Sequence, residues 1–424
     1  MFKRVYDETL HEEFLFAEIN GLPVYVIPKR KFNGKYAIWA TKYGSINKKF
    51  RFEGKTYDVP LGIAHFLEHK MFEKPYGDAF ERYSETGANA NAYTSFNMTA
   101  YLFSCNDNFA KSLDILLDTV TSPYFTEKTV AKEQGIIGQE IAMMNDNPGN
   151  RCFYNLMNCL YHTTPIKYEI AGTAESIMQI TPQLLYDCHR AFYSPKNSVL
   201  CCCGNIDEDE VAGLVEKYFK NDASPVVEPI FDDEPNEIVK TSATDKMSVA
   251  LPIFEFGIKD TAGNMTGPEL DKHAAAMNML IRYITSKSGD FYTRLYNNGT
   301  INSTFGGGIY RLENLGVFSF SGDAHSPETF YEEIIKEIES LKKNGIDPQN
   351  FKRLKNKHYG NLLADFDSVE ELANEYANAH FENMNPLLSA QLYREIDLDY
   401  LNSKLRYLDT SKMASSIIYN IDKE

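Results

Sequence analysis

Two histidines and a glutamate in one short stretch are the residues of this sequence with the clearest potential for chemistry. They lie in the run Gly62-Ile-Ala-His65-Phe-Leu-Glu68-His69. On an α-helix, residues four apart share a face, and a residue three along lies beside them. We therefore expect His65 and His69 to direct both imidazoles at one metal ion, with Glu68 close enough to hold a water molecule bound there.

The spacing His-x-x-Glu-His is the inverted zinc-protease motif, and a catalytic zinc needs one more protein ligand. Nine histidines occur in 424 residues, so composition gives roughly one or two chances in a hundred of such a motif. A helix predicted over residues 127–145 carries Glu133 and Glu140 on one stripe. On spacing alone either carboxylate could bind the metal, and the other would then orient a ligand or the water.

The elements that must position these residues are predicted from periodicity and turn residues. A helix from about residue 61 to 71 carries the motif, and an amphipathic helix over about 108–121 precedes the one at 127–145. Thr126 is the expected N-cap of that last helix. β-rich or fully apolar runs predict strands at 22–27, 36–41, 99–104 and 199–203.

The composition of the chain changes at residues 221–246, which are rich in Pro, Asp and Glu and show no hydrophobic periodicity. We interpret this segment as a linker. It divides the chain into a zinc-bearing catalytic domain at residues 1–220 and a second domain without a metal site at residues 247–424. Two domains also suit the length of 424 residues.

The two domains have the pattern of an internal repeat. A shift of 221 residues superposes the apolar faces of two successive helices, pairing Phe109 with Phe330, Leu113 with Ile334, Leu117 with Ile338 and Ile141 with Leu362. Under the same shift, Glu133 and Glu140 fall on Leu354 and Asn361. We interpret this as two copies of one α+β unit with chemistry in the first copy; the alternative is a chance match of two unrelated helical hairpins.

Composition excludes several classes of function. The net charge of −16 argues against general binding to nucleic acid or to an anionic membrane. The N-terminal residues do not form a signal peptide, and no stretch approaches the roughly 18 apolar residues of a membrane helix. The seven cysteines form no CxxC pair and are interpreted as reduced thiols. We expect a cytoplasmic protein with no nucleic-acid or membrane partner.

The motif, with Glu133 and Glu140 further along, resembles the pitrilysin/insulinase family of zinc peptidases. Further matches are Asn91-Ala-Tyr-Thr94, the segment from Pro165 to Gly172-Thr173, and Phe192-Tyr-Ser-Pro-Lys-Asn197. The length is similar to that of half-size members such as mitochondrial processing peptidase subunits and bacterial relatives. The resemblance implies an α+β fold of two tandem similar domains, each a mostly antiparallel sheet covered by helices on one face.

The resemblance also implies a role for each residue of the site. It makes His65, His69 and Glu140 the ligands of one Zn²⁺ per chain, because the family uses the later glutamate of the pair. Glu68 becomes the general base and Glu133 a supporting carboxylate of the catalytic site. The reaction would be hydrolysis of peptide bonds in oligopeptides or short unfolded polypeptides by a zinc-activated water.

Substrate contact is expected at Asn91, Ala92 and Tyr93. The resemblance implies that these residues lie on a sheet edge beside the metal, where a peptide could add as an extra strand. The small side chain of Ala92 would allow close approach. The alternative interpretation is an ordinary polar turn and strand.

One departure from the family pattern concerns the second domain. Family members carry an Arg and a Tyr seven residues apart that contact the substrate near the zinc, whereas the matching positions here hold Tyr296 and Ser303. Arg294 does not restore the pair, since Ile301 lies seven residues beyond it. We therefore expect the zinc-bearing half of a heterodimer with a paralogous subunit that carries the Arg/Tyr pair, and otherwise a homodimer.

Three hypotheses follow for the function. The first is a zinc metalloendopeptidase, the second is a non-catalytic or scaffolding subunit of a peptidase-like pair, and the third is a structural metal protein. Glu68 argues against the second and third, because neither needs a base and a structural zinc is closed by four ligands. The missing Arg/Tyr pair argues slightly for the second.

Overall fold

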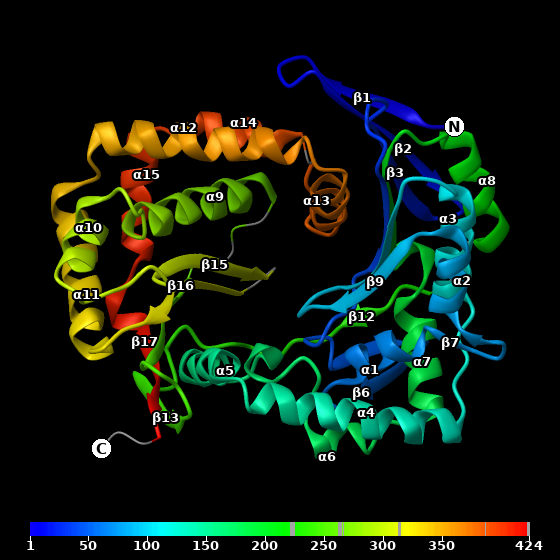
Figure 1. Cartoon of the computed structure of the whole chain (residues 1–424), viewed down its shortest axis with the longest axis horizontal. Helices are drawn as coiled ribbons and strands as arrows, with labels where there is room; N and C mark the ends of the chain where they lie inside the picture. Colours follow the sequence, from blue (N-terminus) through cyan, green and yellow to red (C-terminus); the bar gives the residue numbers. More distant parts are fainter. Residues whose placement is uncertain (221–224, 262–264, 266, 313–314, 386, 422–424) are drawn as a thin grey trace. The chain divides into compact units, whose positions relative to one another are not determined.

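The computed structural model describes residues 1–220, 225–261, 265, 267–312, 315–385 and 387–421 (Figure 1). The chain divides into two compact units that interleave along the sequence. Unit 1 contains Met1–Ile141, Tyr168–Phe231 and Ala364–Leu387. Unit 2 contains Ala142–Lys167, Asp232–Leu363 and Leu388–Glu424.

Unit 1 is built on a seven-stranded sheet in the order β1-β2-β3-β11-β4-β10-β9. Its strands are β1 (Lys3–Asp7), β2 (Glu12–Ile19), β3 (Leu22–Pro28), β4 (Lys35–Thr41), β9 (Asn89–Thr94), β10 (Thr99–Cys105) and β11 (Ser198–Gly204). All neighbours are antiparallel except β3 and β11. The strands predicted at 22–27, 36–41, 99–104 and 199–203 are therefore confirmed.

Unit 2 has a five-stranded sheet in the order β13-β17-β14-β16-β15. Its strands are β13 (Ser242–Met247), β14 (Ile253–Lys259), β15 (Gly306–Leu312), β16 (Leu315–Asp323) and β17 (Met413–Asn420). One pair, β13 with β17, is parallel and the others are antiparallel. This order and these directions repeat those of β3-β11-β4-β10-β9 in unit 1. The fold is therefore α+β, with two similar, mostly antiparallel units, as predicted.

Smaller strands and the helices complete the two units. The remaining strands are β5 (Lys49–Phe52), β6 (Lys55–Asp58), β7 (Glu73–Lys74), β8 (Gly77–Asp78) and β12 (Glu228–Pro229). The helices are α1 (Ile63–Lys70), α2 (Ala79–Thr86), α3 (Phe109–Thr121), α4 (Glu127–Asn145), α5 (Pro148–Leu160), α6 (Ala174–Ile177), α7 (Pro182–Phe192), α8 (Glu208–Tyr218), α9 (Gly267–Ile284), α10 (Asp290–Asn297), α11 (Pro327–Asn344), α12 (Pro348–Asp365), α13 (Val369–Phe381), α14 (Leu388–Glu395) and α15 (Leu398–Lys404). No helix in the described part of the chain is both long and apolar enough to cross a bilayer.

The central strands of unit 1 are buried on both faces, because helices cover both. Trp39 and Cys202 face a core shared with α1, α3 and α7. Ile38, Cys201 and Cys203 point to the opposite face, where α13 supplies the covering residues Leu372, Ala373, Tyr376, Ala377 and Phe381. Helices were expected on one face of each sheet, and α13 covers the second face in unit 1.

Helices α5 and α13 occupy equivalent positions in the two copies of the repeat, since residues 148–160 shifted by 221 become residues 369–381. Each belongs to the unit built mainly from the other half of the sequence. Helix α13 packs on β11 and β4 of unit 1, and α5 packs on β17 and β14 of unit 2. Gly257 on β14 allows α5 to pack closely on the sheet, because a Cβ at this position would lie 2.9 Å from the side chain of Leu156.

The segment expected to be a linker contains ordered structure. Residues 221–224 lie outside the described part, but β12 pairs with β5 and β13 joins the sheet of unit 2. Between them, Glu234 accepts hydrogen bonds from the backbone N–H groups of His162, Thr163 and Thr164 and forms an ion pair with the buried Lys259 at 2.7 Å. These contacts fasten the segment to the end of α5.

Candidate metal centre

The motif lies on α1, a short helix whose start is fixed by a glycine. Gly62 caps it in the left-handed region, with φ at 86°. A Cβ at this position would lie 2.3 Å from the carbonyl oxygen of Ala171, so the close approach also requires glycine. Ile63, Phe66 and Leu67 are buried in the core of unit 1, which leaves the opposite face of α1 to the histidines. The predicted helix and the motif on it are thus anchored by packing.

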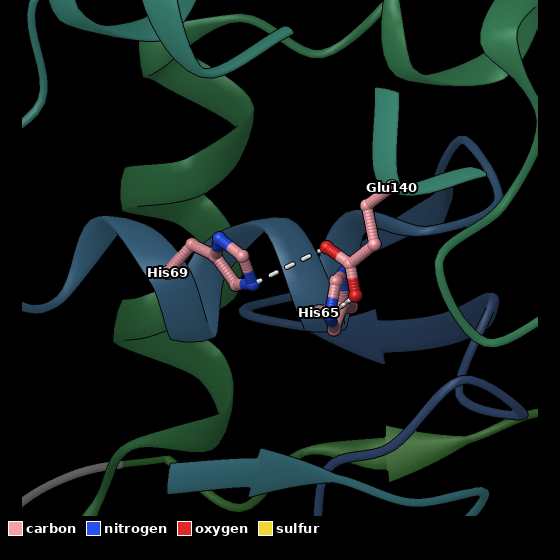
Figure 2. Close-up of side chains that lie close together, drawn as sticks. All are labelled: His65, His69 and Glu140. Atoms are coloured by element: carbon pink, nitrogen blue, oxygen red, sulfur yellow. Dashed lines mark ion pairs between the residues drawn. The ribbon is translucent and has the colours of Figure 1, made fainter. Parts of the chain in front are cut away.

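The structure brings His65, His69 and Glu140 together, and Figure 2 shows the two imidazoles turned toward the carboxylate. One ligand atom from each residue lies within 4.8 Å of the others. His65 Nε2 is 3.6 Å from Glu140 Oε1, and His69 Nε2 is 3.7 Å from Glu140 Oε2. Glu140 comes from α4, whose predicted bounds are confirmed and whose first turn Thr126 caps through its Oγ1.

This donor set fits zinc. Two imidazole nitrogens and one carboxylate are a common set at catalytic zinc sites, which leave one position open. Ligand atoms about 2.0–2.2 Å from a tetrahedral zinc lie roughly 3.3–3.6 Å apart, close to the two distances above. Among the described residues, no other group of three His, Cys, Asp or Glu side chains has this geometry.

The protonation of His65 also suits a metal ligand. Burial, and then the neighbouring His69, lower the pKa of His65 to about 4. The ring is therefore neutral near pH 7 and keeps a lone pair on one nitrogen. Its Nδ1 is buried and has no hydrogen-bond partner among the described residues. Metal binding requires such a neutral imidazole.

Glu133 contacts the other histidine from the side away from Glu140. His69 Nδ1 lies 3.1 Å from Glu133 Oε1, so the carboxylate favours the tautomer with its proton on Nδ1. Burial alone would raise the pKa of Glu133, but this hydrogen bond and the charges of His69 and Lys70 lower it overall. Glu133 is therefore an ionised acceptor that leaves His69 Nε2 available.

Glu68 lies beside the cluster and is almost fully buried, with 7% of its surface exposed. Burial raises its pKa to about 7, although His69 and a hydrogen bond from Thr94 act in the opposite direction. A general base with a pKa near the working pH can both accept and release a proton. Thr94 Oγ1 donates to Glu68 Oε2 at 2.9 Å. Thr94 belongs to a stretch that matches the family, but its contact with Glu68 depends on how β9 packs against α1, which the sequence does not show.

The residues expected to bind substrate lie on β9, the last strand of its sheet. Asn91, Ala92 and Tyr93 pair with Leu102, Tyr101 and Ala100 of β10, and β9 has no strand on its other side among the described residues. Asn91 is exposed and Ala92 is half-buried, while the Tyr93 hydroxyl donates to Asn374 Oδ1 at 3.2 Å. Helix α1 packs against β9, so the free edge runs beside the motif.

Tyr296 and Ser303, at the positions of the expected Arg/Tyr pair, are both exposed in unit 2. Tyr296 stacks on Tyr292 within α10, with ring centroids 5.9 Å apart. Arg294 is engaged elsewhere, in an ion pair with Glu333 at 2.8 Å.

Comparison with known proteins shows the family of this chain. The model of the insulinase family, peptidase family M16, matches residues 54–174, and the model described as the peptidase M16 inactive domain matches residues 179–357. The chain belongs to the M16 family. The first match contains the whole His65, His69 and Glu140 cluster, and the second covers most of unit 2.

Relatives within the M16 family cover nearly the whole chain. An uncharacterized zinc protease, YmfH of Bacillus subtilis, is 38% identical over 92% of this chain and 92% of its own length. The zinc protease PqqE of Helicobacter pylori is 24% identical over 86% of this chain and 82% of its own. The crystal structure of an M16-like peptidase from Alicyclobacillus acidocaldarius has a TM-score of 0.93 at 32% identity, covering 96% of this chain and 98% of that one.

Proposed function

We propose that this M16 family member is a zinc metalloendopeptidase acting on oligopeptides or short unfolded polypeptides. The observation that carries the proposal is the convergence of His65, His69 and Glu140 next to the buried Glu68. These three residues would hold one Zn²⁺ per chain. When bound, zinc supplies Lewis-acid chemistry: it acidifies a water and polarises the scissile carbonyl.

Glu68 would move the protons of the reaction. Its Oε2 accepts the hydrogen bond from Thr94, which leaves Oε1 to take a proton from the attacking water. The same carboxyl group can then give that proton to the leaving nitrogen. Without a metal, burial raises the pKa of Glu68 to about 7, and a bound cation would favour the ionised form that a base requires. The hydrogen bond to Glu133 would keep the His69 imidazole in one orientation throughout the reaction.

The free edge of β9 would bind the substrate as an added strand. Backbone groups of Asn91, Ala92 and Tyr93 would pair with the peptide, and such pairing tolerates many sequences but requires an extended chain. The small Ala92 leaves the edge accessible. Thr94, at the end of the same strand, would set the substrate's position relative to Glu68.

A scaffolding subunit is the second candidate, and the exposed Tyr296 and Ser303 in place of an Arg/Tyr pair favour it. We propose instead that the chain is the zinc-bearing half of a heterodimer whose paralogous partner carries that pair. A homodimer is the remaining arrangement. Zinc content and peptide cleavage separate the candidates.

The decisive experiment compares three purified proteins. Wild type should contain about one zinc per chain and cleave unstructured fluorogenic peptides. Glu68→Gln should retain the zinc and lose activity by orders of magnitude, whereas His65→Ala should lose the zinc. Full zinc in His65→Ala would refute the metal site. Substantial turnover by Glu68→Gln would refute the assigned base, and no turnover by wild type with any partner would favour the scaffold.

A further inference from the structure

Lys70, the residue directly after the motif, is a fully buried lysine. Its side chain has no exposed surface, and its ammonium forms ion pairs with Glu73 and, at 3.8 Å, with Glu133 Oε2. Burying an ammonium is costly unless carboxylates compensate it, so lysine is rarely found in such a position. A buried lysine on the helix of the metal cluster therefore calls for an explanation.

The two oxygens of Glu133 are divided between two neighbours. Oε1 accepts from His69 Nδ1 at 3.1 Å, and Oε2 faces Lys70 Nζ at 3.8 Å. The attraction between Lys70 Nζ and Oε2 opposes rotation of the Glu133 carboxylate away from the imidazole. Lys132 also acts on Glu133, but it is exposed and its charge is therefore screened by solvent.

The two histidines of the cluster differ in their support. His69 is fixed through Nδ1 by Glu133, whereas His65 Nδ1 has no partner among the described residues. The orientation of His69 Nε2, which lies 3.7 Å from Glu140 Oε2, thus depends on the carboxylate behind it.

We propose that Lys70 is a positioning residue of the metal centre, whose buried ammonium anchors Glu133 so that Glu133 holds His69 with Nε2 toward the metal. The inference rests on the proposed zinc site. It extends that site by a chain of contacts that runs from Lys70 to Glu133 and from Glu133 to His69. Lys70 acts through Glu133 and touches neither metal nor substrate.

The test is zinc affinity, measured by competition with a chromophoric chelator. Lys70→Met, which keeps the length of the side chain and removes the charge, should weaken zinc binding about tenfold, the size typical of losing support behind a ligand. Lys70→Gln serves as a second variant that retains a donor. Circular dichroism and thermal unfolding of the metal-free proteins check that both variants fold.

Lys74 offers a matched control. It is also a buried lysine, with 3% of its surface exposed, but its Nζ donates to the backbone carbonyls of Thr119 and Ser122. Lys74→Met should lower the melting temperature and leave zinc affinity unchanged. If loss of a buried lysine weakened zinc binding only by destabilising the fold, Lys70→Met and Lys74→Met would lower zinc affinity to a similar extent.

A double-mutant cycle with Glu133→Gln tests the route of the effect. If Lys70 acts through Glu133, Lys70→Met should cost nothing further once Glu133 is neutral. Wild-type affinity in folded Lys70→Met and Lys70→Gln would overturn the proposal, as would an equal loss with and without Glu133. Failure of the zinc site itself would be seen separately, as full zinc in His65→Ala.

Discussion

Thr94 Oγ1 donates a hydrogen bond to Glu68 Oε2 at 2.9 Å, which joins the end of strand β9 to the buried carboxylate on α1. Thr94 Oγ1 also lies 3.4 Å from the hydroxyl of Thr99, which donates its own proton to the carbonyl oxygen of Tyr43 at 2.7 Å. The contact with Glu68 is the shorter one and its acceptor is a carboxylate, so the Thr94 proton goes to Glu68. The strand proposed to bind substrate and the proposed base are thus held together by one side chain.

This relationship predicts a specific kinetic effect of Thr94→Val. The variant keeps the shape of the side chain but removes the donor, so Glu68 loses the bond that orients Oε2. We expect kcat for a peptide substrate to fall about tenfold or more, with KM and zinc content near wild type. Thr94→Ser keeps the hydroxyl and should restore most of the rate. A rise in KM with constant kcat would instead assign Thr94 to substrate binding.

The choice between the two glutamates on α4 predicts unequal losses of zinc. Glu140→Gln removes the carboxylate that lies between His65 and His69 and should release most of the metal. Glu133→Gln removes the support behind His69 and should weaken zinc binding roughly 10–100-fold. Isothermal titration or chelator competition measures both. The reverse order would make Glu133 the ligand.

The contacts of Glu234 predict how stability depends on pH. Burial alone would raise its pKa, but Lys259 and three backbone N–H groups lower it from 4.5 to about 2. Because the folded-state pKa lies below the ordinary value, this stabilisation is present above pH 4.5 and is lost as the pH falls toward about 2. Glu234→Gln should reduce the free energy of unfolding by about 2 kcal/mol at pH 7.

Urea unfolding at several pH values tests this prediction. The difference between wild type and Glu234→Gln should narrow as the pH drops below 4.5. A difference that stays constant from neutral to acidic pH would show that the carboxylate is not responsible. Asp233→Asn, at an exposed position in the same segment, provides a variant with the same loss of charge.

The proposed split site predicts that activity depends on a partner. The chain alone should bind zinc and cleave peptides poorly, and co-expression with a neighbouring paralogue that carries the Arg/Tyr pair should raise the rate on the order of 10²–10³-fold if those residues act in the transition state. Size measurement and a peptide assay on the co-purified complex test this. A stable homodimer with full activity, unchanged by the paralogue, would contradict it.

Much of the site was predictable because its residues lie at helical spacing. His65, Glu68 and His69 needed only the period of the α-helix, and Glu133 and Glu140 followed from a second amphipathic helix. Geometry from spacing could not choose between those two glutamates, since both occupy one stripe of α4. The family resemblance selected Glu140, and in the structure Glu140 lies near both Nε2 atoms while Glu133 lies behind His69.

Other features depend on tertiary contacts that no local pattern contains. The strands and the repeat were visible in the sequence, but the amphipathic pattern of α5 or α13 does not say which sheet each helix covers. The contact of Thr94 with Glu68 depends on how strand β9 packs against helix α1. Lys70 resembles an ordinary surface lysine in sequence, and only burial reveals its two carboxylate neighbours.

The exchanged helices have a consequence for how the protein is made. The face of the first sheet formed by Ile38, Cys201 and Cys203 stays open to water until residues 369–381 leave the ribosome. Synthesis of the intervening residues takes on the order of ten seconds or more, during which this apolar face is exposed to aggregation or to a chaperone. Unit 1 therefore completes its native fold only after residue 387 has been made, although most of its sequence lies in the first half of the chain.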